Sequence, residues 1–171
     1  GPIYQDDDFD GVTAQEIAVF IGPNYRRYLS VFKMMRDSGH NFSFNWSAFF
    51  FNYCFLFYRK LYRPAIVVMS LVAMLFIPRL MYSSESIKYF LNVYMQVPVD
   101  YDLGLLGNLG TLISVINIVQ LALMFVVASF SDRLYYNHVV REIKKLRSAA
   151  PSTLSQDQYL TMLAFNGRTN P

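Results

Sequence analysis

Two apolar stretches decide the fold, and the first reads Ala65-Ile-Val-Val-Met-Ser-Leu-Val-Ala-Met-Leu-Phe-Ile77 before continuing through Pro78-Arg79 to Tyr82. The second runs from Leu105 to Phe130 and contains no charged residue. At about 1.5 Å per residue, the stretch 65–82 makes a helix of roughly 27 Å, which is close to the thickness of a bilayer's hydrocarbon core. Both stretches are therefore predicted to be transmembrane helices.

The composition of the whole chain supports this prediction. Hydrophobic residues make up 54% of the 171 residues and charged residues only 16%, whereas about 25% of the residues in soluble domains are charged. A water-soluble chain of this length could not bury so much apolar surface. The expected fold class is an all-α membrane protein.

An aromatic segment, residues 44–58, precedes the first span and contains Trp46, Phe49 and Phe50. It is about 15 residues long, and a spanning helix needs about 20. Its aromatic and asparagine side chains suit the membrane–water interface better than the hydrocarbon centre. We predict a single re-entrant or interfacial helix here, and not a third span.

The predicted membrane domain covers residues 44–131 and includes the re-entrant segment and the spans 65–82 and 105–130. Amphipathic helices are predicted before and after this domain in the sequence. An acidic, disordered tail is expected over residues 1–12, followed by cytoplasmic helices over 13–43 whose first turn has the capping-box spacing Thr13–Glu16. Residues 83–103 are expected to form a polar loop with a short helix at 86–96. The region 132–171 is expected to be a basic helical tail, with one helix at 132–147 and a last one capped by Thr153 and Gln156.

Lysine and arginine are unevenly distributed between the predicted loops, which indicates the orientation. With two spans, thirteen of the 15 basic residues fall on one side of the membrane and two on the other. If the aromatic segment also crossed, the division would be nine against six. Because cytoplasmic loops are enriched in Lys and Arg, the first arrangement is favoured, with both termini in the cytoplasm.

Asn117 and Gln120 are polar residues in the interior of the second span, and Ser114 lies near them. Polar side chains in small membrane bundles commonly form hydrogen bonds between helices. We expect these residues to bond to the other helices, and consider a polar transport path as the less favoured interpretation.

Four segments of the chain form a recognisable set: Phe20-Ile-Gly22-Pro-Asn-Tyr25, Phe44-Asn45-Trp46-Ser-Ala48-Phe49-Phe50-Phe51, Tyr58-Arg59-Lys60-Leu-Tyr62 and, more weakly, Arg133-Leu-Tyr135-Tyr136-x-His138. With these segments the chain resembles a bacterial family of small inner-membrane proteins catalogued as domain of unknown function 2628. The resemblance implies a location in the bacterial inner membrane and no known activity. The family often has Gly-Pro after the aromatic run, where this chain has Asn52-Tyr53, and this departure argues against a sharp turn there.

The motifs of known chemistry are incomplete. Asp6-x-Asp8-x-Asp10-Gly11 matches the first half of a calcium loop, but Ile17 stands where the bidentate carboxylate should be. The two histidines, His40 and His138, lack the spacing of a metal site, and Cys54 has no nearby base to activate it. No catalytic, metal-binding or cofactor-binding residue is predicted, and no cofactor.

Three functions remain to be weighed. The favoured one is a non-enzymatic inner-membrane protein whose cytoplasmic basic and aromatic platform binds anionic membrane lipid or a protein partner, as an immunity or adaptor protein would. The alternative is a transport or channel component that works as a homo-oligomer, and an enzyme acting on lipids ranks last. Nucleic acid is not expected as a partner. The predicted contact residues are Arg26, Arg27, Trp46, Phe49, Phe50, Arg59, Lys60, Arg63, Arg141, Lys144 and Lys145.

Overall fold

The structure, a computed structural model, describes residues 1–168, and within that range it contains seven helices and one two-stranded sheet. The chain divides into two compact units. One consists of Gly1–Ala65 together with the residues from Val126 onward, and we call it the terminal unit. The other, Ile66–Phe125, is called the helical hairpin. The chain is all-α apart from the small sheet, as predicted.

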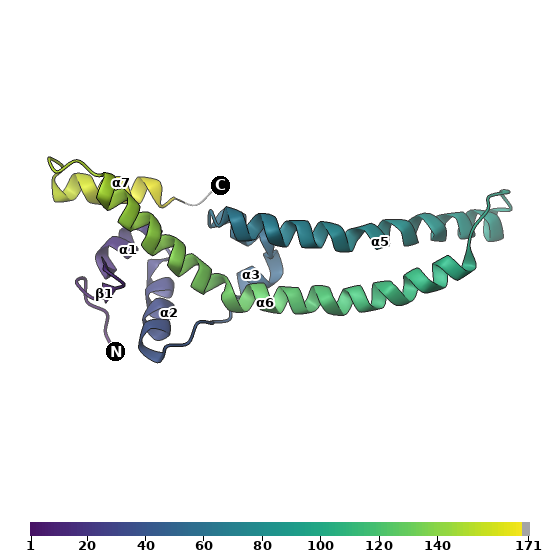
Figure 1. Cartoon of the computed structure of the whole chain (residues 1–171), viewed down its shortest axis with the longest axis horizontal. Helices are drawn as coiled ribbons and strands as arrows, with labels where there is room; N and C mark the ends of the chain where they lie inside the picture. The colour runs from purple at the N-terminus through teal and green to yellow at the C-terminus, as the bar shows by residue number, and fades with distance from the viewer. Residues whose placement is uncertain (169–171) are drawn as a thin grey trace. The chain divides into compact units, whose positions relative to one another are not determined.

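The helical hairpin is built from two long helices, α5 (Tyr62–Met95) and α6 (Leu103–Ala149), which run antiparallel over Ile66–Phe125 (Figure 1). The predicted polar loop at 83–103 begins too early, because α5 continues without a break to Met95; the helix predicted at 86–96 is its last part, and the chain leaves the helix there as expected. An ion pair between Lys88 and Glu85, one turn apart at 2.6 Å, stabilises this polar extension. Glu85 also accepts a hydrogen bond from the backbone of Asp102 over 3.2 Å, which closes the connection to α6.

Helix α6 passes through Asp132 without a break, although a separate helix was predicted to begin there. Charge at Asp132 marks a change of polarity along the chain, but it does not end a helix. The sequence contains neither glycine nor proline between residues 111 and 150, so nothing interrupts the backbone hydrogen bonds.

The N-terminal residues form a β-hairpin that the sequence analysis missed. Strands β1 (Asp8–Phe9) and β2 (Val12–Thr13) pair around Asp10 and Gly11, whose φ angles are 55° and 87°. Asp-Gly with two positive φ values is the preferred sequence for a tight hairpin turn. Phe9 and Val12 are fully buried. The prediction of a disordered tail is therefore wrong for residues 8–12.

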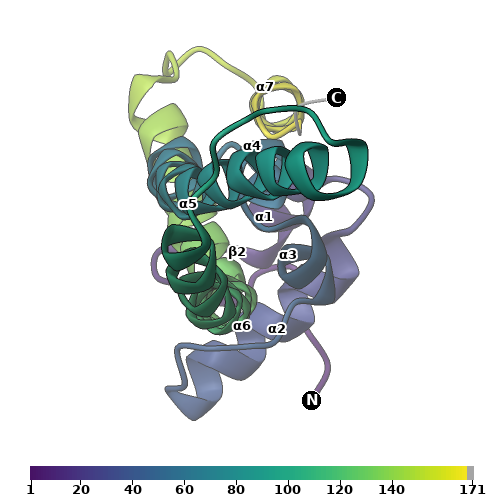
Figure 2. The same cartoon turned by 90° about the vertical axis from the view of Figure 1, so that its right-hand side faces the viewer.

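Two of the three short helices around this β-hairpin, the first and the last, begin at side-chain caps. Helix α1 (Ala14–Ile21) has the predicted capping box between Thr13 and Glu16. Helix α2 (Tyr25–Ser38) follows, and α7 (Gln156–Asn166) packs on α1 (Figure 1). Figure 2 looks along the axis of α7. The cap of α7 is Ser155 with Gln158, and not the predicted Thr153 with Gln156, because a turn from Pro151 to Leu154 takes up the earlier residues.

The aromatic segment forms two helices where one was predicted. Helix α3 (Trp46–Phe51) ends at Asn52, and α4 (Tyr53–Tyr58) begins directly after it. Asn52 has φ 47° and ψ −120°, a backbone conformation that non-glycine residues rarely adopt. A sharp turn therefore exists at this point without the glycine that the resemblance led us to require.

Candidate functional site

A buried carboxylate organises the terminal unit where α3 meets α6. Asp132 is completely buried, and its Oδ1 accepts a hydrogen bond from Asn45 Nδ2 over 2.7 Å. Its Oδ2 accepts one from Ser43 Oγ over 2.9 Å and lies 3.8 Å from Arg27 Nη2. Because a buried charge is costly unless it is paired and hydrogen-bonded, Asp132 holds Asn45 and Ser43 in place, while Arg27 is paired with it more loosely.

The backbone adds to this connection. The amides of Ser43 and Asn45 donate to the carbonyls of Ser129 and Ala128, each over 3.0 Å. The Asn45 side chain uses its other end as an N-cap, since Oδ1 accepts from the amide of Ala48 over 3.1 Å. The start of α3 is thus tied to residues 128–132 of α6, where the long apolar run of that helix ends and its first charge follows.

Arg59 is the second cation at this site, and it is buried with only 6% of its surface exposed. Its guanidinium carbon lies 4.7 Å from the ring centre of Tyr28, 5.1 Å from that of Tyr135 and 5.2 Å from that of Tyr58. Burial raises the pKa of Tyr135 to about 12, so its hydroxyl stays neutral and cannot compensate the charge. Within residues 1–168, no carboxylate lies within 4.0 Å of Arg59, and its Nε has no hydrogen-bond partner.

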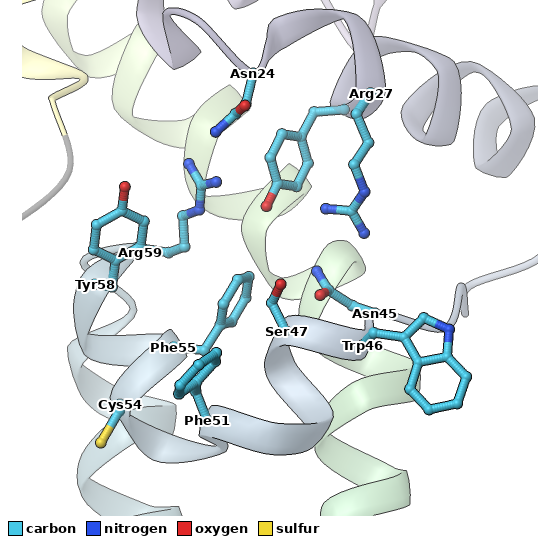
Figure 3. A pocket seen from close by; sticks show the side chains of 11 residues that line it. Asn24, Arg27, Asn45, Trp46, Ser47, Phe51, Cys54, Phe55, Tyr58 and Arg59 are labelled. Carbon is cyan, nitrogen blue, oxygen red and sulfur yellow. The ribbon is translucent and has the colours of Figure 1, made fainter.

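A pocket of about 630 Å³ lies between α2, α3 and α4, and Arg27 and Arg59 both line it (Figure 3). Phe51 and Phe55 form the opposite, apolar side, while the Cys54 thiol and the Trp46 ring point away from the two guanidinium groups. Guanidinium groups bind phosphate and carboxylate oxygens well. The pocket therefore suits an anion that is attached to an apolar group. Its lining residues are Asn24, Arg27, Tyr28, Asn45, Trp46, Ser47, Phe51, Cys54, Phe55, Tyr58 and Arg59.

Aromatic side chains extend from this pocket to the surface. Trp46, Phe50 and Phe51 are each 65% exposed, and Trp46 stacks on Phe50 at 6.0 Å. Phe49 is half-buried and lies 5.2 Å from Phe50, ring centre to ring centre. Large apolar patches that face water are unusual on soluble proteins, so this cluster indicates contact with lipid or with another protein.

The other predicted basic residues divide into two groups. Lys60, Arg63, Arg141 and Lys145 line a second, separate cavity of about 800 Å³ in the terminal unit. Arg26 and Lys144 line neither this cavity nor the pocket of Arg59. Arg26 is exposed and donates to the hydroxyl of Tyr25 over 3.2 Å. Lys144 lies beside Gly11, in the turn between strands β1 and β2.

The polar residues of the second span behave differently from one another. Asn117 and Gln120 accept hydrogen bonds from Arg79 of the facing helix, over 2.6 and 2.8 Å. Ser114 instead donates to the carbonyl of Gly110 in its own helix, over 3.2 Å. Within the part of the chain that the structure describes, no three His, Cys, Asp or Glu side chains are grouped so that they could hold a metal ion.

A third polar cluster joins the two ends of the chain, and the sequence analysis did not foresee it. Glu16 is buried, and its two oxygens accept from Arg147 Nη2 over 2.6 Å and from the hydroxyl of Tyr159 over 2.5 Å. Burial alone would raise the pKa of Glu16, but the hydrogen bonds from Arg147, Tyr159 and Thr13 outweigh it and lower the pKa below the ordinary value. Glu16 is thus an ionised link between α1, α6 and α7.

Sequence reasoning found Arg27 and Arg59 but missed the residues that position them, Asp132, Tyr28 and Tyr135. One signal was present, because Asp132 is the first charge after the 26-residue apolar run 105–130. A carboxylate directly after so long an apolar run is expected to need a partner if it is buried. The partner itself, Asn45, lies 87 residues earlier and has no pattern that connects it to Asp132.

Comparison with known proteins gives one match. The model of a family described as a protein of unknown function (DUF2628) matches residues 14–141. The matched region includes Arg27, Asn45, Arg59 and Asp132 and ends before Arg147 and Tyr159. No curated protein and no solved structure matches the chain. Because the match covers well over half of the 171 residues, the chain belongs to the DUF2628 family.

Proposed function

We propose that this chain is an integral protein of the bacterial inner membrane, with two spans and both termini in the cytoplasm, and that its Arg27–Arg59 pocket binds the headgroup of an anionic lipid. The protein acts by binding and does not catalyse a reaction. The observation that carries the proposal is Arg59, a buried cation at the wall of a pocket, with no carboxylate within 4.0 Å among residues 1–168.

The surface of the two long helices supports insertion in a bilayer. Their most apolar 18-residue windows are only 11% buried in α5 and 17% buried in α6. A core helix of a soluble protein would be mostly covered by other parts of the chain. Side chains such as Ile77, Ile118 and Val126 are instead more than half exposed. Lipid is the environment in which such a surface is stable.

The depth of the aromatic helices follows from their attachment to α6. Ser43 and Asn45 bond to the carbonyls of residues 128 and 129, at the end of the apolar run and just before Asp132. If α6 leaves the hydrocarbon there, α3 lies at the membrane–water interface. Tryptophan and phenylalanine at the surface of α3 suit this position, because aromatic rings collect at headgroup level. The pocket then opens where lipid headgroups are.

The uncompensated positive charge of Arg59 favours an anionic lipid as the ligand. A buried charge without a partner destabilises a folded protein, and an incoming phosphate would remove that penalty at Arg59. Arg27 can add a second contact because it is half-exposed and only loosely paired with Asp132 at 3.8 Å. Phe51 and Phe55 offer an apolar surface for the first part of an acyl chain.

The test is lipid retention in nanodiscs of phosphatidylcholine that contain a minor share of phosphatidylglycerol, measured by native mass spectrometry of the released protein. The wild-type chain is expected to retain phosphatidylglycerol, and Arg59→Gln and Arg27→Gln to weaken retention about tenfold, the loss of one charged hydrogen bond. Arg26→Gln is the matched control, since it changes the same charge on the same helix outside the pocket.

Two outcomes count against the lipid. Equal retention by wild type and Arg59→Gln would show that the pocket does not hold the headgroup. Displacement of the lipid by soluble glycerol 3-phosphate at similar affinity would show that the site recognises a free phosphate and not a membrane lipid.

Orientation is tested separately with single cysteines in a Cys54→Ser background. Arg141→Cys and Lys88→Cys replace residues on opposite sides of the proposed membrane. A membrane-impermeant maleimide applied to intact cells is expected to label the cysteine at 88 and not the one at 141. Labelling of both positions, or of 141 alone, would contradict the proposed topology.

A further inference from the structure

Arg79 places a positive charge between the two long helices. Its Nη2 donates to Asn117 Oδ1 over 2.6 Å and to Gln120 Oε1 over 2.8 Å, and all three residues belong to the helical hairpin. Both acceptors are neutral amides. Among residues 1–168, no carboxylate lies within 4.0 Å of Arg79. The charge is therefore hydrogen-bonded but not compensated.

The position of the acceptors fixes the depth of this charge, provided that the hairpin spans the membrane as proposed above. Asn117 stands 14 residues before Ser131, which is about 21 Å along the helix, and Gln120 about 17 Å. A hydrocarbon core is about 30 Å thick, so both amides lie inside it. Side chains on a helix lean towards its N-terminus, and Arg79 therefore extends deeper into the core and not towards the far surface.

The cluster is also open to the outside of the hairpin. Asn117 is exposed, and Arg79 and Gln120 are only partly covered. Phe76, one turn before Arg79, and Leu121, one turn after Asn117, are 53% and 49% exposed, so the polar spot is flanked by apolar surface on both helices. Ionisable groups at such a depth ordinarily face a partner group or a protein interior and not lipid tails.

We propose that this face binds a transmembrane helix of another protein that carries an Asp or Glu at the depth of Arg79. The partner carboxylate would compensate the guanidinium, and its helix would cover Phe76 and Leu121. A second copy of this chain fits poorly, because it would bring another Arg79 and add repulsion between like charges. A lipid phosphate is held at the surface and does not reach this depth. Charge complementarity thus selects an acidic helix.

The probe is a synthetic leucine–alanine transmembrane helix with one central Glu, and the matched controls carry Gln or Lys at the same place. The full-length chain is labelled at its single, exposed Cys54 with a fluorescence donor and reconstituted in phosphatidylcholine vesicles, and energy transfer to an acceptor on the peptide measures binding. Alkaline buffer keeps the Glu ionised. We expect the Glu peptide to bind about tenfold more tightly than the Gln peptide, and the Lys peptide to bind least.

Two variants test whether the charge at position 79 determines which peptide is preferred. Arg79→Leu keeps the helix apolar and is expected to bind the Glu and Gln peptides equally. Arg79→Glu is expected to reverse the order and prefer the Lys peptide. Equal binding of all peptides by the wild-type chain would overturn the proposal, and so would a preference for Glu that Arg79→Leu retains.

Two further outcomes separate this proposal from others. If labelled wild-type chains associate with one another and Arg79→Leu abolishes that association, the face is an interface between copies, and the acidic helix is ruled out. If alkaline washing strips the chain from the vesicles, insertion itself has failed, and the proposed function falls together with this inference. An inserted chain without peptide preference overturns only the inference.

Discussion

Asn45 Nδ2 donates to Asp132 Oδ1 over 2.7 Å, and both side chains are completely buried. This bond connects the aromatic segment to the long helix α6 across 87 residues of sequence. Because Asn45 also caps α3 through Ala48, one amide side chain determines both where α3 begins and where it is attached. The Arg27–Arg59 pocket depends on this arrangement, since Asn45 is part of its wall.

Replacing Asp132 tests this dependence. Asp132→Ala is expected to lower the free energy of unfolding by about 3 kcal/mol, because Asn45 and Ser43 lose their acceptor inside the protein. Asp132→Asn is the control of equal size and still offers an acceptor, so a loss of about 1 kcal/mol is expected. Thermal unfolding in detergent, followed by the fluorescence of the single Trp46 next to Asn45, measures both values. Equal losses would show that the carbonyl acceptor is unimportant.

Arg59→Met is expected to separate stability from binding. Methionine fills similar space and removes a buried, uncompensated charge, so the unliganded protein should become more stable by about 1 kcal/mol. Retention of phosphatidylglycerol should fall at the same time, because the charge is what the headgroup contacts. Unfolding in detergent free of anionic lipid and the nanodisc measurement give the two values. A variant that loses stability and lipid together would indicate a structural role for Arg59 alone.

The ionised Glu16 carboxylate is expected to contribute to the free energy of unfolding in a way that is lost in acid. Its pKa in the folded protein is lowered from an ordinary value of 4.5, so the ionised form is favoured by folding. The stability that this group adds is present above pH 4.5 and is lost as the pH falls through the lowered pKa. Glu16→Gln removes the titrating group. The stability difference between wild type and Glu16→Gln should therefore shrink below pH 4.5, and a difference that grows there would contradict the assignment.

Asn52 tests the turn between α3 and α4. Its positive φ is strained for a residue with a Cβ and easy for glycine. Asn52→Gly is therefore expected to preserve or raise the melting temperature, whereas Asn52→Val should lower the free energy of unfolding by about 1 kcal/mol or more. If valine were tolerated as well as glycine, the break between the two helices could not depend on this backbone conformation.

Local patterns predicted the features that depend on neighbouring residues. The capping box at Thr13 and the two apolar helices are confirmed because caps and apolar runs act within a few residues of each other. The Asp10-Gly11 hairpin had an equally local signal, but the charges around it were interpreted as a solvated tail. Two buried apolar residues, Phe9 and Val12, outweigh those charges.

The site could be predicted only in part for a different reason. Arg59 was identified by its charge and position, but its burial depends on tyrosines at positions 28 and 135, which are far apart in sequence. Arg79 donates to Asn117 and Gln120 of the facing helix, and no local pattern connects it to them. Contacts of this kind depend on which helices become neighbours, and a single sequence does not contain that information.

The link from Glu16 to Arg147 and Tyr159 has a consequence for biosynthesis. These partners are translated 131 and 143 residues after Glu16, so the N-terminal helix leaves the ribosome long before the groups that hold it exist. Both apolar helices are synthesised in the interval. Helix α1 is therefore made before both apolar helices but is linked to Arg147 and Tyr159 only after them, and a nascent chain that stops before α7 leaves the Glu16 carboxylate without the Tyr159 hydroxyl.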